Sequence, residues 1–510
     1  MPFRQTGFEH NTAVMLRTYP LYTAAQVRQL DRIAIDEAGI PGYTLMSRAG
    51  KTAWDLLRNC WPEARSLLVL CGTGNNGGDG YVIGRLALEA GHAVLVMQLG
   101  DAAGIRGDAL AAREAYIAAG GKVEPFEASV PAHVELVIDA MLGTGLEREP
   151  TGEWLAAIDM LNAGKQPVVA VDIPTGLHAD TGRVLGSAVR ADLTVTFIGR
   201  KPGLYTGQGP ELAGKVVFDD LQVPDSVYMQ VPAQAEQVTG VSNNIPVLHR
   251  PRTAHKGRHG HVLVIGGEQG MPGAVLLAGH AALRSGAGLV SVATRPSHAA
   301  ALAAACPEVM CHGVRAAKEL GPLLACATVV AIGPGLGRSS WSRQLLAQVL
   351  ETSLPLVVDA DALNLLALEP AHRENWIITP HPGEAGRLLG LPAAGVQQDR
   401  LAAVRGLVER FGGTAVLKGA GSLVCTAGRP IAVCTVGNPG MATAGMGDVL
   451  TGVIAALIAQ RLPLADAAVL GVCLHGQAGD RAAAGGERGL LARDLIDELR
   501  HVVNAQGETA

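Results

Sequence analysis

The chain has 510 residues, about three times the usual domain length of roughly 150, so we expect two large domains or three ordinary ones. Its 41 Lys and Arg residues nearly balance its 46 Asp and Glu residues, and the net charge of -5 gives no electrostatic case for a nucleic-acid or acidic-membrane partner. Hydrophobic residues make up 48% and aromatic residues only 4%, which favours a layered α/β fold.

The eight cysteines are scattered and form no Cys-x-x-Cys pair, so we interpret them as reduced core residues rather than a disulfide or zinc framework. The first twenty residues contain no apolar run of signal-peptide length. The longest strongly apolar stretch, Val449–Ala459, is too short to cross a bilayer. We therefore expect a cytoplasmic protein with no membrane partner.

From about Tyr19 to Val223, short apolar runs alternate with helical segments, which is typical of successive βαβ units. In open parallel sheets, the turns at the carboxyl ends of such strands share one ligand-binding crevice. Several of the expected strands end in Gly-rich or acidic turns, among them those that end at Cys71, Asp139 and Asp172. The six expected strands of this half are Ser66–Cys71, Ala93–Met97, Val134–Asp139, Pro167–Asp172, Leu193–Ile198 and Lys215–Phe218.

The segment Gly72–Gly80 follows a strand, precedes a helical stretch at Tyr81–Glu89 and contains the pattern Gly-x-Gly-x-x-Gly. The next strand is followed by Gln98, where a dinucleotide dehydrogenase has an acidic residue, and no Gly-Lys-Ser/Thr of a P-loop is present. Its unhindered backbone N–H groups suit a phosphate. In the alternative interpretation, the glycines only form a tight turn and Asp79 caps a helix.

Asp139 and Asp172 each end an apolar strand, and Thr175 follows Asp172 by three residues. With an Asn amide oxygen, their oxygens would form a cluster suited to K⁺, Na⁺ or Mg²⁺. The alternative is that both aspartates only cap turns.

Four motifs of this half together resemble the N-terminal domain of the bifunctional NAD(P)H-hydrate repair enzymes. They are Leu21–Gly50, Gly74–Gly80, Asp139–Gly145 and Val171–Gly176. The resemblance implies a Rossmann-like three-layer sandwich at residues 1–230. It also implies an epimerase that interconverts the R and S forms of hydrated NADH and NADPH.

The resemblance also implies the residues of the epimerase site. Asp172 is the candidate catalytic acid or base at the reacting ring, since inverting a hydroxyl-bearing carbon needs such a group. K⁺ would be bound by Asn76, Asp139 and Thr175, the last of which is usually Ser in the family. The hydrate would be bound by Asn75, Asn76, Gly77, Gly78, Asp79, Gly143, Thr144, Gly145, Leu146, Glu147, Arg148, Glu149 and Asp172.

Periodicity is lost between Pro224 and Arg252, and we place the boundary of the domains there, at 230/231. A basic segment at 255–261 is equally compatible with a phosphate contact and with a solvated linker end. A second α/β alternation follows. Its expected strands are His261–Gly266, Leu289–Ala293, Val329–Gly333, Leu356–Asp361, Trp376–Thr379, Ala415–Lys418 and Ile431–Cys434.

The stretch Asn438–Gly452 is the most informative in the chain. Gly445 and Gly447 place unhindered N–H groups before the helical run Val449–Gln460, beside the carboxylate of Asp448. This arrangement is that of the ribokinase-like superfamily, in which the Asp deprotonates a hydroxyl that attacks a nucleotide phosphate. The alternative is a buried helix N-cap.

Further turns of this half support a nucleotide site. Lys418–Ser422 supplies a cation and a flexible loop, and Gly333–Gly337 supplies a turn that permits close approach. His381 lies between two prolines, which favours a functional position over a core position.

Six motifs of the second half resemble the ADP-dependent (S)-NAD(P)H-hydrate dehydratase. They are His261–Gly267, Gly286–Val290, Asp359–Asn364, Thr379–Glu384, Val416–Gly421 and Asn438–Thr443. The resemblance implies a ribokinase-like domain at 231–510 with Asp448 as catalytic base, ADP as co-substrate and Mg²⁺ bridging its phosphates. The hydrate would contact Ala274, Gly335, His381 and Asp448. The nucleotide would contact Lys418, Gly419, Ala420, Gly421, Ser422 and Gly447.

Together the two halves predict a metabolite repair enzyme that epimerises hydrated NAD(P)H and dehydrates its S form, with AMP and phosphate as coproducts. One competing hypothesis is a kinase of the hydroxymethylpyrimidine or sugar type fused to a ligand-binding domain. Another is a first domain that acts only as a dinucleotide sensor. We expect small-molecule substrates, no nucleic acid and a homo-oligomer.

Overall fold

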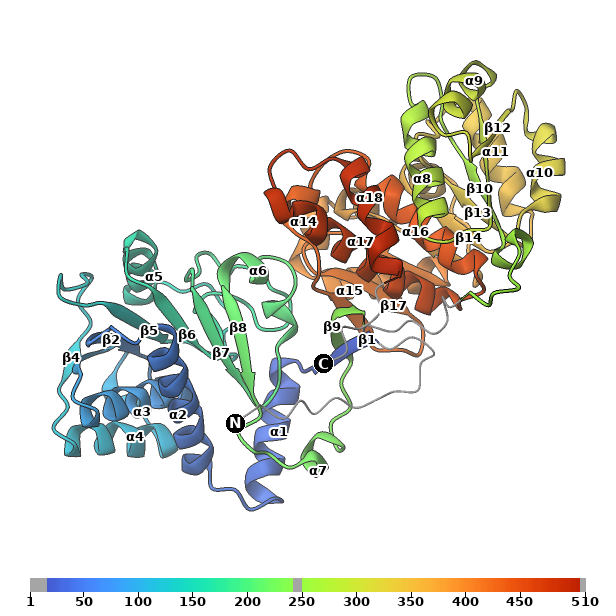
Figure 1. Ribbon diagram of the computed structural model, residues 1–510. Helices are drawn as coiled ribbons and strands as arrows, with labels where there is room; N and C mark the ends of the chain where they lie inside the picture. The colour runs from blue at the N-terminus through green and yellow to red at the C-terminus, as the bar shows by residue number, and fades with distance from the viewer. Residues whose placement is uncertain (1–15, 242–249, 505–510) are drawn as a thin grey trace. The chain divides into compact units, whose positions relative to one another are not determined.

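The computed structural model describes residues 16–241 and 250–504. It divides the chain into two compact units (Figure 1). The first unit is Pro20–Ala235, and the second unit combines residues 16–19 with the described residues from Glu236 onward. The division lies five residues beyond the boundary expected from the sequence. The sequence also gave no sign that residues 16–19 belong to the second unit.

The first unit is built on a seven-stranded sheet of order β4-β3-β2-β5-β6-β7-β8 in which every pairing is parallel. Strand β2 pairs with β3 on one side and with β5 on the other, so the carboxyl ends of β2 and β5 form a topological switch point, where ligands bind in such sheets. The strands are β2 (Ser66–Cys71), β3 (Ala93–Gln98), β4 (Val123–Pro125), β5 (Leu136–Ala140), β6 (Val168–Val171), β7 (Leu193–Phe197) and β8 (Lys215–Asp219).

Helices cover both faces of this sheet. Leu67 and Val69 of β2 pack in one core with residues of α1 to α4, whereas Leu68 and Leu70 pack on the opposite face with residues of α5. Such fully buried aliphatic side chains stabilise the fold by roughly 1.5–3 kcal/mol each. The helices are α1 (Ala24–Asp36), α2 (Gly42–Cys60), α3 (Asn75–Glu89), α4 (Gly107–Ala118), α5 (Glu153–Ala163), α6 (Gly209–Leu212) and α7 (Asp225–Tyr228). The predicted three-layer α/β arrangement is confirmed.

The second unit contains an eleven-stranded sheet of order β1-β9-β18-β17-β16-β15-β14-β13-β10-β11-β12. Strand β10 pairs with β11 and β13, which sets a second switch point at its carboxyl end. The strands are β1 (Leu16–Leu21), β9 (Ala235–Val241), β10 (His261–Ile265), β11 (Leu289–Thr294), β12 (Met310–Gly313), β13 (Val329–Ile332), β14 (Leu356–Val358), β15 (Trp376–Ile378), β16 (Thr414–Leu417), β17 (Ser422–Thr426) and β18 (Ile431–Cys434).

This sheet is not parallel throughout, a feature that the sequence analysis did not address. β16 pairs antiparallel with β17, and β17 pairs antiparallel with β18. The connection at 418–421 is too short for the crossover that a parallel pair needs, so only an antiparallel pair can form. The predicted strand Leu356–Asp361 is also shorter than expected, because Asp359 is the N-cap of α12 (Ala360–Leu368).

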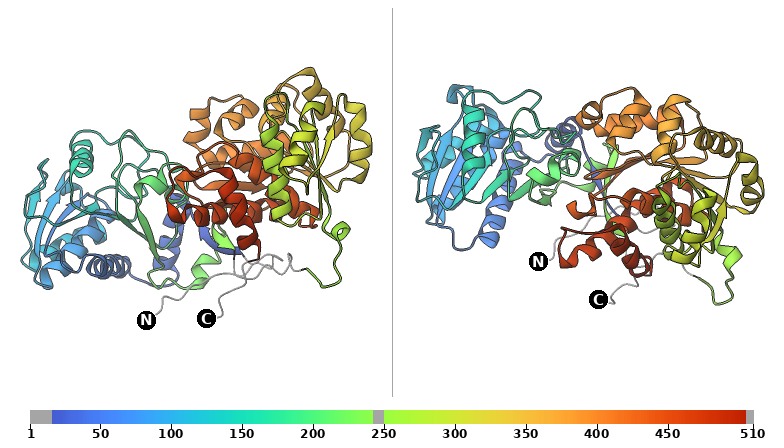
Figure 2. Two further views of the ribbon diagram at one scale, coloured as in Figure 1. Left: turned by 45° about the horizontal axis from the view of Figure 1, so that its top comes forward. Right: turned by 90° about the horizontal axis from the view of Figure 1, so that it is seen from above.

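Figure 2 shows helices on both sides of the second sheet. They are α8 (Pro272–Arg284), α9 (Pro296–Ala305), α10 (Gly321–Cys326), α11 (Ser340–Leu350), α13 (Pro382–Leu389), α14 (Ala393–Gln398), α15 (Arg400–Phe411), α16 (Met446–Ala459), α17 (Leu464–Ala482) and α18 (Ala492–Val503), in addition to α12.

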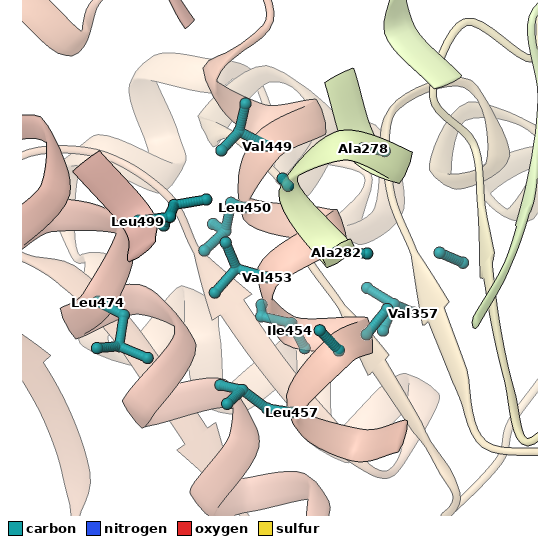
Figure 3. Packing of buried hydrophobic residues seen from close by; sticks show 14 of the residues in the cluster. Ala278, Ala282, Val357, Val449, Leu450, Val453, Ile454, Leu457, Leu474 and Leu499 are labelled. Carbon is teal, nitrogen blue, oxygen red and sulfur yellow. The ribbon is translucent and has the colours of Figure 1, made fainter. Parts of the chain in front are cut away.

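Helix α16 lies at the centre of the second core. It begins after Gly445, whose φ of 88° suits glycine, and its Leu, Ile, Val and Ala residues pack against α8, α17, α18 and β14 (Figure 3). Gly452 permits this packing, because a Cβ there would lie 2.1 Å from the carbonyl oxygen of Ala278. Of all its residues, only Gly447 and Asp448 are not buried. The first turn of α16 is therefore the part of this helix that a ligand can reach.

The segment 224–252, in which we place the domain boundary, contains regular structure in its described part although it shows no sequence periodicity. Helix α7 and strand β9 lie there, and β9 joins the second sheet beside β18, where the Thr435 N–H donates to the Val238 carbonyl (3.0 Å). The remainder of the segment, 242–249, lies outside the described residues. All eight cysteines are free, as predicted, but Cys60 and Cys326 are exposed rather than in the core. Among the helices of the described ranges, none is long and apolar enough to cross a membrane.

Candidate functional sites

The Gly-rich segment of the first unit is mostly helix rather than loop, because α3 begins at Asn75, six residues before the predicted helical stretch. Its glycines let this end of the helix lie against the strand ends. A Cβ on Gly77 would lie 2.0 Å from the carbonyl oxygen of Gly72, and one on Gly80 would lie 2.6 Å from the Ala140 Cβ. Gln98 is buried and accepts a hydrogen bond from the Tyr81 hydroxyl, so it serves the core rather than a ribose.

Asp139 and Thr175 form a buried polar cluster at the switch point. The Thr175 hydroxyl and backbone N–H donate to the two carboxylate oxygens of Asp139, at 2.7 Å and 2.8 Å. The Leu142 N–H donates to the Thr175 hydroxyl (3.0 Å), which ties the adjoining loop to the cluster. Burial raises the pKa of Asp139 to about 6, although its hydrogen bonds from Thr175 oppose this.

Asn76 lies at the same loop. A Cβ on Gly143 would lie 3.3 Å from the Asn76 Cβ and 3.8 Å from its Oδ1. The Asn76 side chain is 9% exposed, and both of its polar atoms are buried without a hydrogen-bond partner among the described residues. A buried amide without a partner is costly unless a ligand satisfies it. Asn76 and the cluster of Asp139 and Thr175 therefore offer hard oxygen atoms that could hold a cation.

Asp172 follows β6 in a backbone conformation that only a few non-glycine residues adopt, with φ of 67°. Its carboxylate accepts a hydrogen bond from Lys201, a residue that the sequence analysis missed. The ammonium group of Lys201 is fully buried and also donates to the Thr196 hydroxyl (2.9 Å) and the Phe197 carbonyl (3.0 Å). The signal available in the sequence was a lysine just after an apolar strand and before Pro202.

Two more carboxyl groups lie within electrostatic range of this ion pair. Burial raises the pKa of Asp31, on α1, to about 6; Asp172 adds to this rise and Lys201 opposes it. Burial also raises the pKa of Asp79 well above its usual range, with smaller contributions from Asp172 and Asp31. The site therefore combines one buried cation with three carboxyl groups, of which sequence reasoning found only Asp79 and Asp172.

The other predicted residues of the first site line the same end of the sheet with more exposure. Asn75 is exposed, and the loop from Gly143 to Glu149 changes from half-buried to exposed along its length. Glu149 approaches Gly186, where a Cβ would lie 3.4 Å from the glutamate side chain.

In the second unit, Asp448 and Gly447 form the first turn of α16. A Cβ on Gly447 would lie 3.3 Å from the Lys418 Nζ and 3.6 Å from an oxygen of Asp359. The predicted base, the predicted nucleotide-binding lysine and this glycine are thus brought together. Burial raises the pKa of Asp448 to about 7, and Asp359 contributes a further rise that Lys418 partly offsets.

A buried ionic network holds Lys418 in place. Its Nζ donates to Asp359 (2.7 Å), whose other oxygen accepts from the Thr451 hydroxyl (2.8 Å), and it lies 3.9 Å from Glu384. Burial opposes the charge of Lys418, but Asp359 and Glu384 outweigh it, and its pKa is raised. Lys418 is therefore a fixed positive charge beside the start of α16, where a phosphate is favoured.

His381 is the N-cap of α13. Its Nδ1 accepts from the Gly383 N–H (3.0 Å), while the Glu384 carboxylate accepts from the His381 N–H (2.8 Å). The imidazole side chain is 51% exposed, so it is held by the cap and open to a ligand at the same time. This capping role was not foreseen.

Gly335 and Ala274 are neighbours across the second switch point. Gly335 has φ of 54°, and a Cβ there would lie 3.1 Å from the Ala274 Cβ. Next to them, the Gly337 N–H donates to Asp361 (2.9 Å), which brings the 333–337 turn to the start of α12. The turns that follow β10, β13 and β14 thus meet, as the parallel strand order predicts.

Arg400 fixes the loop at 418–422 through hydrogen bonds to its backbone, a role that the sequence analysis missed. Arg400 is 1% exposed and donates to the carbonyls of Leu417 (3.3 Å), Lys418 (3.4 Å) and Gly421 (3.4 Å). Gly419 passes over the guanidinium, since a Cβ there would lie 2.8 Å from Arg400 Nη1. Burial lowers the pKa of Arg400 to about 10.

Across residues 16–241 and 250–504, no three His, Cys, Asp or Glu side chains converge as a metal site. The basic segment 255–261 forms a mostly exposed turn before β10.

The two units define an α/β protein with a polar site at the carboxyl ends of the strands of each sheet, one beside a buried Lys–Asp pair and one at a helix N-terminus that suits a phosphate. The family model described as NAD(P)H-hydrate dehydratase matches residues 262–501. The model described as YjeF-related protein N-terminus matches residues 42–203.

Relatives match over nearly the whole chain. The bifunctional NAD(P)H-hydrate repair enzyme Nnr of Coxiella burnetii is 50% identical over 95% of this chain and 99% of its own length. The enzyme of the same name from Escherichia coli is 44% identical over 96% of this chain and 95% of its own. The chain belongs to the family of bifunctional NAD(P)H-hydrate repair enzymes.

Among solved structures, an ADP/ATP-dependent NAD(P)H-hydrate dehydratase from Bacillus subtilis, co-crystallised with ATP and Mg²⁺, is 30% identical. The match covers 50% of this chain and 92% of that one, with a TM-score of 0.46.

Proposed function

We propose that the first unit epimerises the R and S forms of hydrated NADH and NADPH, and that the second unit dehydrates the S form at the expense of ADP. The observation that carries the proposal is the first turn of α16, where Asp448, with a pKa near 7, lies beside Gly447 and the Lys418 ammonium. A general base works best with a pKa near the working pH. Membership of the repair-enzyme family supports the choice of substrate.

In the second site, hydroxide is a poor leaving group, so the hydrate hydroxyl is first phosphorylated. Asp448 removes the hydroxyl proton, the oxygen bonds to the β-phosphorus of ADP, and the bond to AMP breaks. Phosphate then leaves the ring carbon as a proton is lost from its neighbour, which yields NAD(P)H, AMP and phosphate. Lys418 and the N–H groups around Gly447 stabilise the phosphate charge.

The remaining predicted residues bind and orient the two substrates. Lys418 to Ser422 form the adenosine phosphate loop, whose shape Arg400 maintains through its bonds to the loop carbonyls. Ala274, Gly335 and the exposed imidazole of His381 contact the hydrate. Carboxylates near Asp448, such as Asp361, would help to hold Mg²⁺, which would supply positive charge to neutralise part of the phosphate charge.

In the first site, Asp172 acts as the acid or base at the reacting carbon. Residues 75–79 and the loop 143–149 hold the rest of the hydrate, because the N–H groups at the start of α3 favour its phosphates. Asn76, Asp139 and Thr175 hold K⁺, whose charge would satisfy the buried Asn76 amide oxygen and help to fix the loop at Gly143.

The test uses a mixture of R and S hydrates and follows the absorbance of the NADPH that is formed, with and without ADP, Mg²⁺ and K⁺. We expect complete ADP-dependent recovery, faster than spontaneous epimerisation allows. Recovery of the S fraction only would refute the epimerase. A stable phosphorylated product without NADPH would instead support the small-molecule kinase.

Two variants assign the sites to the units. Asp172→Asn should limit rapid recovery to the S fraction, whereas Asp448→Asn should abolish recovery but leave epimerisation of the hydrates intact. Replacement of K⁺ by Li⁺ should slow epimerisation alone, and Asn76→Ala should remove that dependence on the cation. A K⁺-independent wild type would refute the cation site.

A further inference from the structure

We propose that Lys201 is a positioning residue of the first site, which holds one oxygen of the Asp172 carboxylate so that the other oxygen faces the substrate. The inference rests on the proposed epimerase function. It adds a residue to that site which no motif indicated, and it assigns a task to a fully buried ammonium group.

The contacts of Lys201 are complete within the protein. An ammonium group has three donors, and Lys201 has three acceptors: the Asp172 carboxylate, the Thr196 hydroxyl and the Phe197 carbonyl. None of its donors is left for a ligand, and its side chain is 0% exposed. Lys201 therefore does not bind substrate directly but acts through Asp172.

The contacts of Asp172 are divided unequally between its two oxygens. Oδ1 accepts from Lys201, and the Thr196 hydroxyl and the Phe197 N–H lie 3.3 Å from the same atom. Oδ2 has no hydrogen-bond partner within the described ranges, and the side chain is 17% exposed. One oxygen is thus anchored and the other is available for a proton.

The backbone of Asp172 supports the same arrangement. Its φ of 67° is unfavourable for a residue with a side chain, and a conformation of this kind costs of order 1–3 kcal/mol unless its surroundings enforce it. The Asp172 N–H donates to the Val195 carbonyl (2.7 Å), so β7 fixes the main chain while Lys201 fixes the side chain. Both anchors come from the segment 195–201.

Lys201 also affects the two carboxyl groups that neighbour Asp172. Asp172 raises the pKa of Asp31 and of Asp79, and Lys201 lowers both. The ammonium group therefore offsets the repulsion among the three carboxyl groups, in addition to holding the Asp172 side chain.

The experiment measures epimerisation by the full-length protein carrying Lys201→Met, with Lys215→Met as the matched control, because Lys215 is exposed on β8 of the same sheet. We expect Lys201→Met to lower kcat by about 100-fold while KM changes by less than about threefold, since the lost group orients a catalytic side chain and does not contact the substrate. Dehydration of the pure S form by the same sample should be unchanged.

A double-mutant cycle separates positioning from a merely structural role. If Lys201 acts through Asp172, the double variant Lys201→Met/Asp172→Asn should be no slower than Asp172→Asn alone. Multiplying losses, or a kcat of Lys201→Met equal to that of the wild type, would overturn the proposal. A wild type that does not epimerise would refute the proposed function instead.

If Lys201→Met fails to fold, Thr196→Val replaces it in the cycle. This variant removes one acceptor of Lys201 together with a hydroxyl that itself lies 3.3 Å from the anchored Asp172 oxygen, and it is nearly isosteric in a fully buried position. It therefore tests the anchoring of that oxygen by Thr196 and Lys201 together. We expect it to lower kcat several-fold in the wild-type background and to have no effect in Asp172→Asn. An equal effect in both backgrounds would also overturn the proposal.

Discussion

Asp448 lies in the first turn of a buried helix, and burial raises its pKa to about 7. The group is a base only when ionised. Its charged form is lost as the pH falls through the raised pKa, so dehydration should fall with a midpoint near pH 7, well above the ordinary range of Asp.

The measurement is kcat for dehydration of the S form between about pH 5 and pH 9. Asp448→Asn should lower kcat by about 10²–10⁴-fold and remove the acid limb. The control is Asp497→Asn, an exposed carboxyl on α18, which should keep both the rate and the midpoint. A wild-type midpoint near pH 4 would contradict the assignment.

Gly447 leaves room for a phosphate because glycine has no side chain. A Cβ there would lie in ordinary or slightly tight contact with Lys418 and Asp359, so Gly447→Ala should fold. The methyl group would nevertheless keep a phosphate away from the backbone N–H groups and the ammonium. We expect KM for ADP to rise about tenfold, equivalent to roughly 1.4 kcal/mol, with the melting temperature unchanged.

The matched control for Gly447→Ala is Gly321→Ala, since a Cβ at Gly321 meets no heavy atom within 4 Å. Steady-state kinetics with ADP varied at a saturating hydrate concentration distinguishes the two. Equal KM values in both variants would show that the phosphate does not approach Gly447.

At the level of elements, the start of α3 depends on glycine for its contact with the sheet. Gly77→Ala would place a Cβ 2.0 Å from the Gly72 carbonyl oxygen, so the backbone must move. Such overpacking typically costs about 1–3 kcal/mol. We expect a lower melting temperature of the first unit and loss of epimerisation, with dehydration of the S form retained.

Gly104→Ala is the control for Gly77→Ala, because a Cβ at Gly104 meets no heavy atom within 4 Å. Differential scanning calorimetry and both activity assays are applied to each variant. Unchanged epimerisation by Gly77→Ala would mean that the helix start is not part of the site.

The loop between β16 and β17 depends on a side chain from another element. Arg400→Met removes the donors to the carbonyls of Leu417, Lys418 and Gly421, and hydrogen bonds from a charged donor contribute about 1.5–3 kcal/mol each. The loop should relax, and KM for ADP should rise more than kcat falls.

Arg410→Met serves as the control on the same helix, since Arg410 is exposed. Isothermal titration with AMP measures the nucleotide affinity directly. If Arg400→Met bound AMP as tightly as Arg410→Met did, the proposed support of the nucleotide loop would be refuted.

The sequence predicted strands well where both faces are covered. The runs that became β2, β5 and β13 are mostly apolar, and all their residues are buried. β1 and β12 were missed because most of their residues are only half-buried or exposed, and β9 because it contains Gly, Gln and Thr. Edge position weakens the apolar pattern on which such predictions depend.

The site was predictable to the extent that it follows local motifs. Glycines before a helical run mark Gly447 and Asp448, and Asn76 lies in a Gly-rich segment. Lys201 and Arg400 reach their partners only through the tertiary fold, so no spacing pattern marks them. The capping bonds of His381 likewise depend on where α13 begins.

On the scale of the whole molecule, β1 belongs to the second sheet although it precedes the first unit in the chain. Deletion of residues 1–19 should expose an edge of β9 and remove the apolar contact of Leu16 with the second core. We expect lower stability of the second unit and of the dehydratase, by about 1–3 kcal/mol, with epimerisation unaffected.

The control deletion removes residues 1–12 and leaves β1 complete. Chemical denaturation followed by each activity reports on each unit separately. Equal stability of the two truncated proteins would show that β1 contributes nothing to the second sheet.

The neighbouring strands β1 and β9 also set the order of events during synthesis. β1 leaves the ribosome before any other described strand, yet its neighbour β9 follows only after the whole first unit has been translated. β9 can pair with its other neighbour, β18, only after residues 431–434 have been translated. The first unit can fold as soon as it emerges, whereas the sheet of the second unit is closed at this edge only when translation is almost finished.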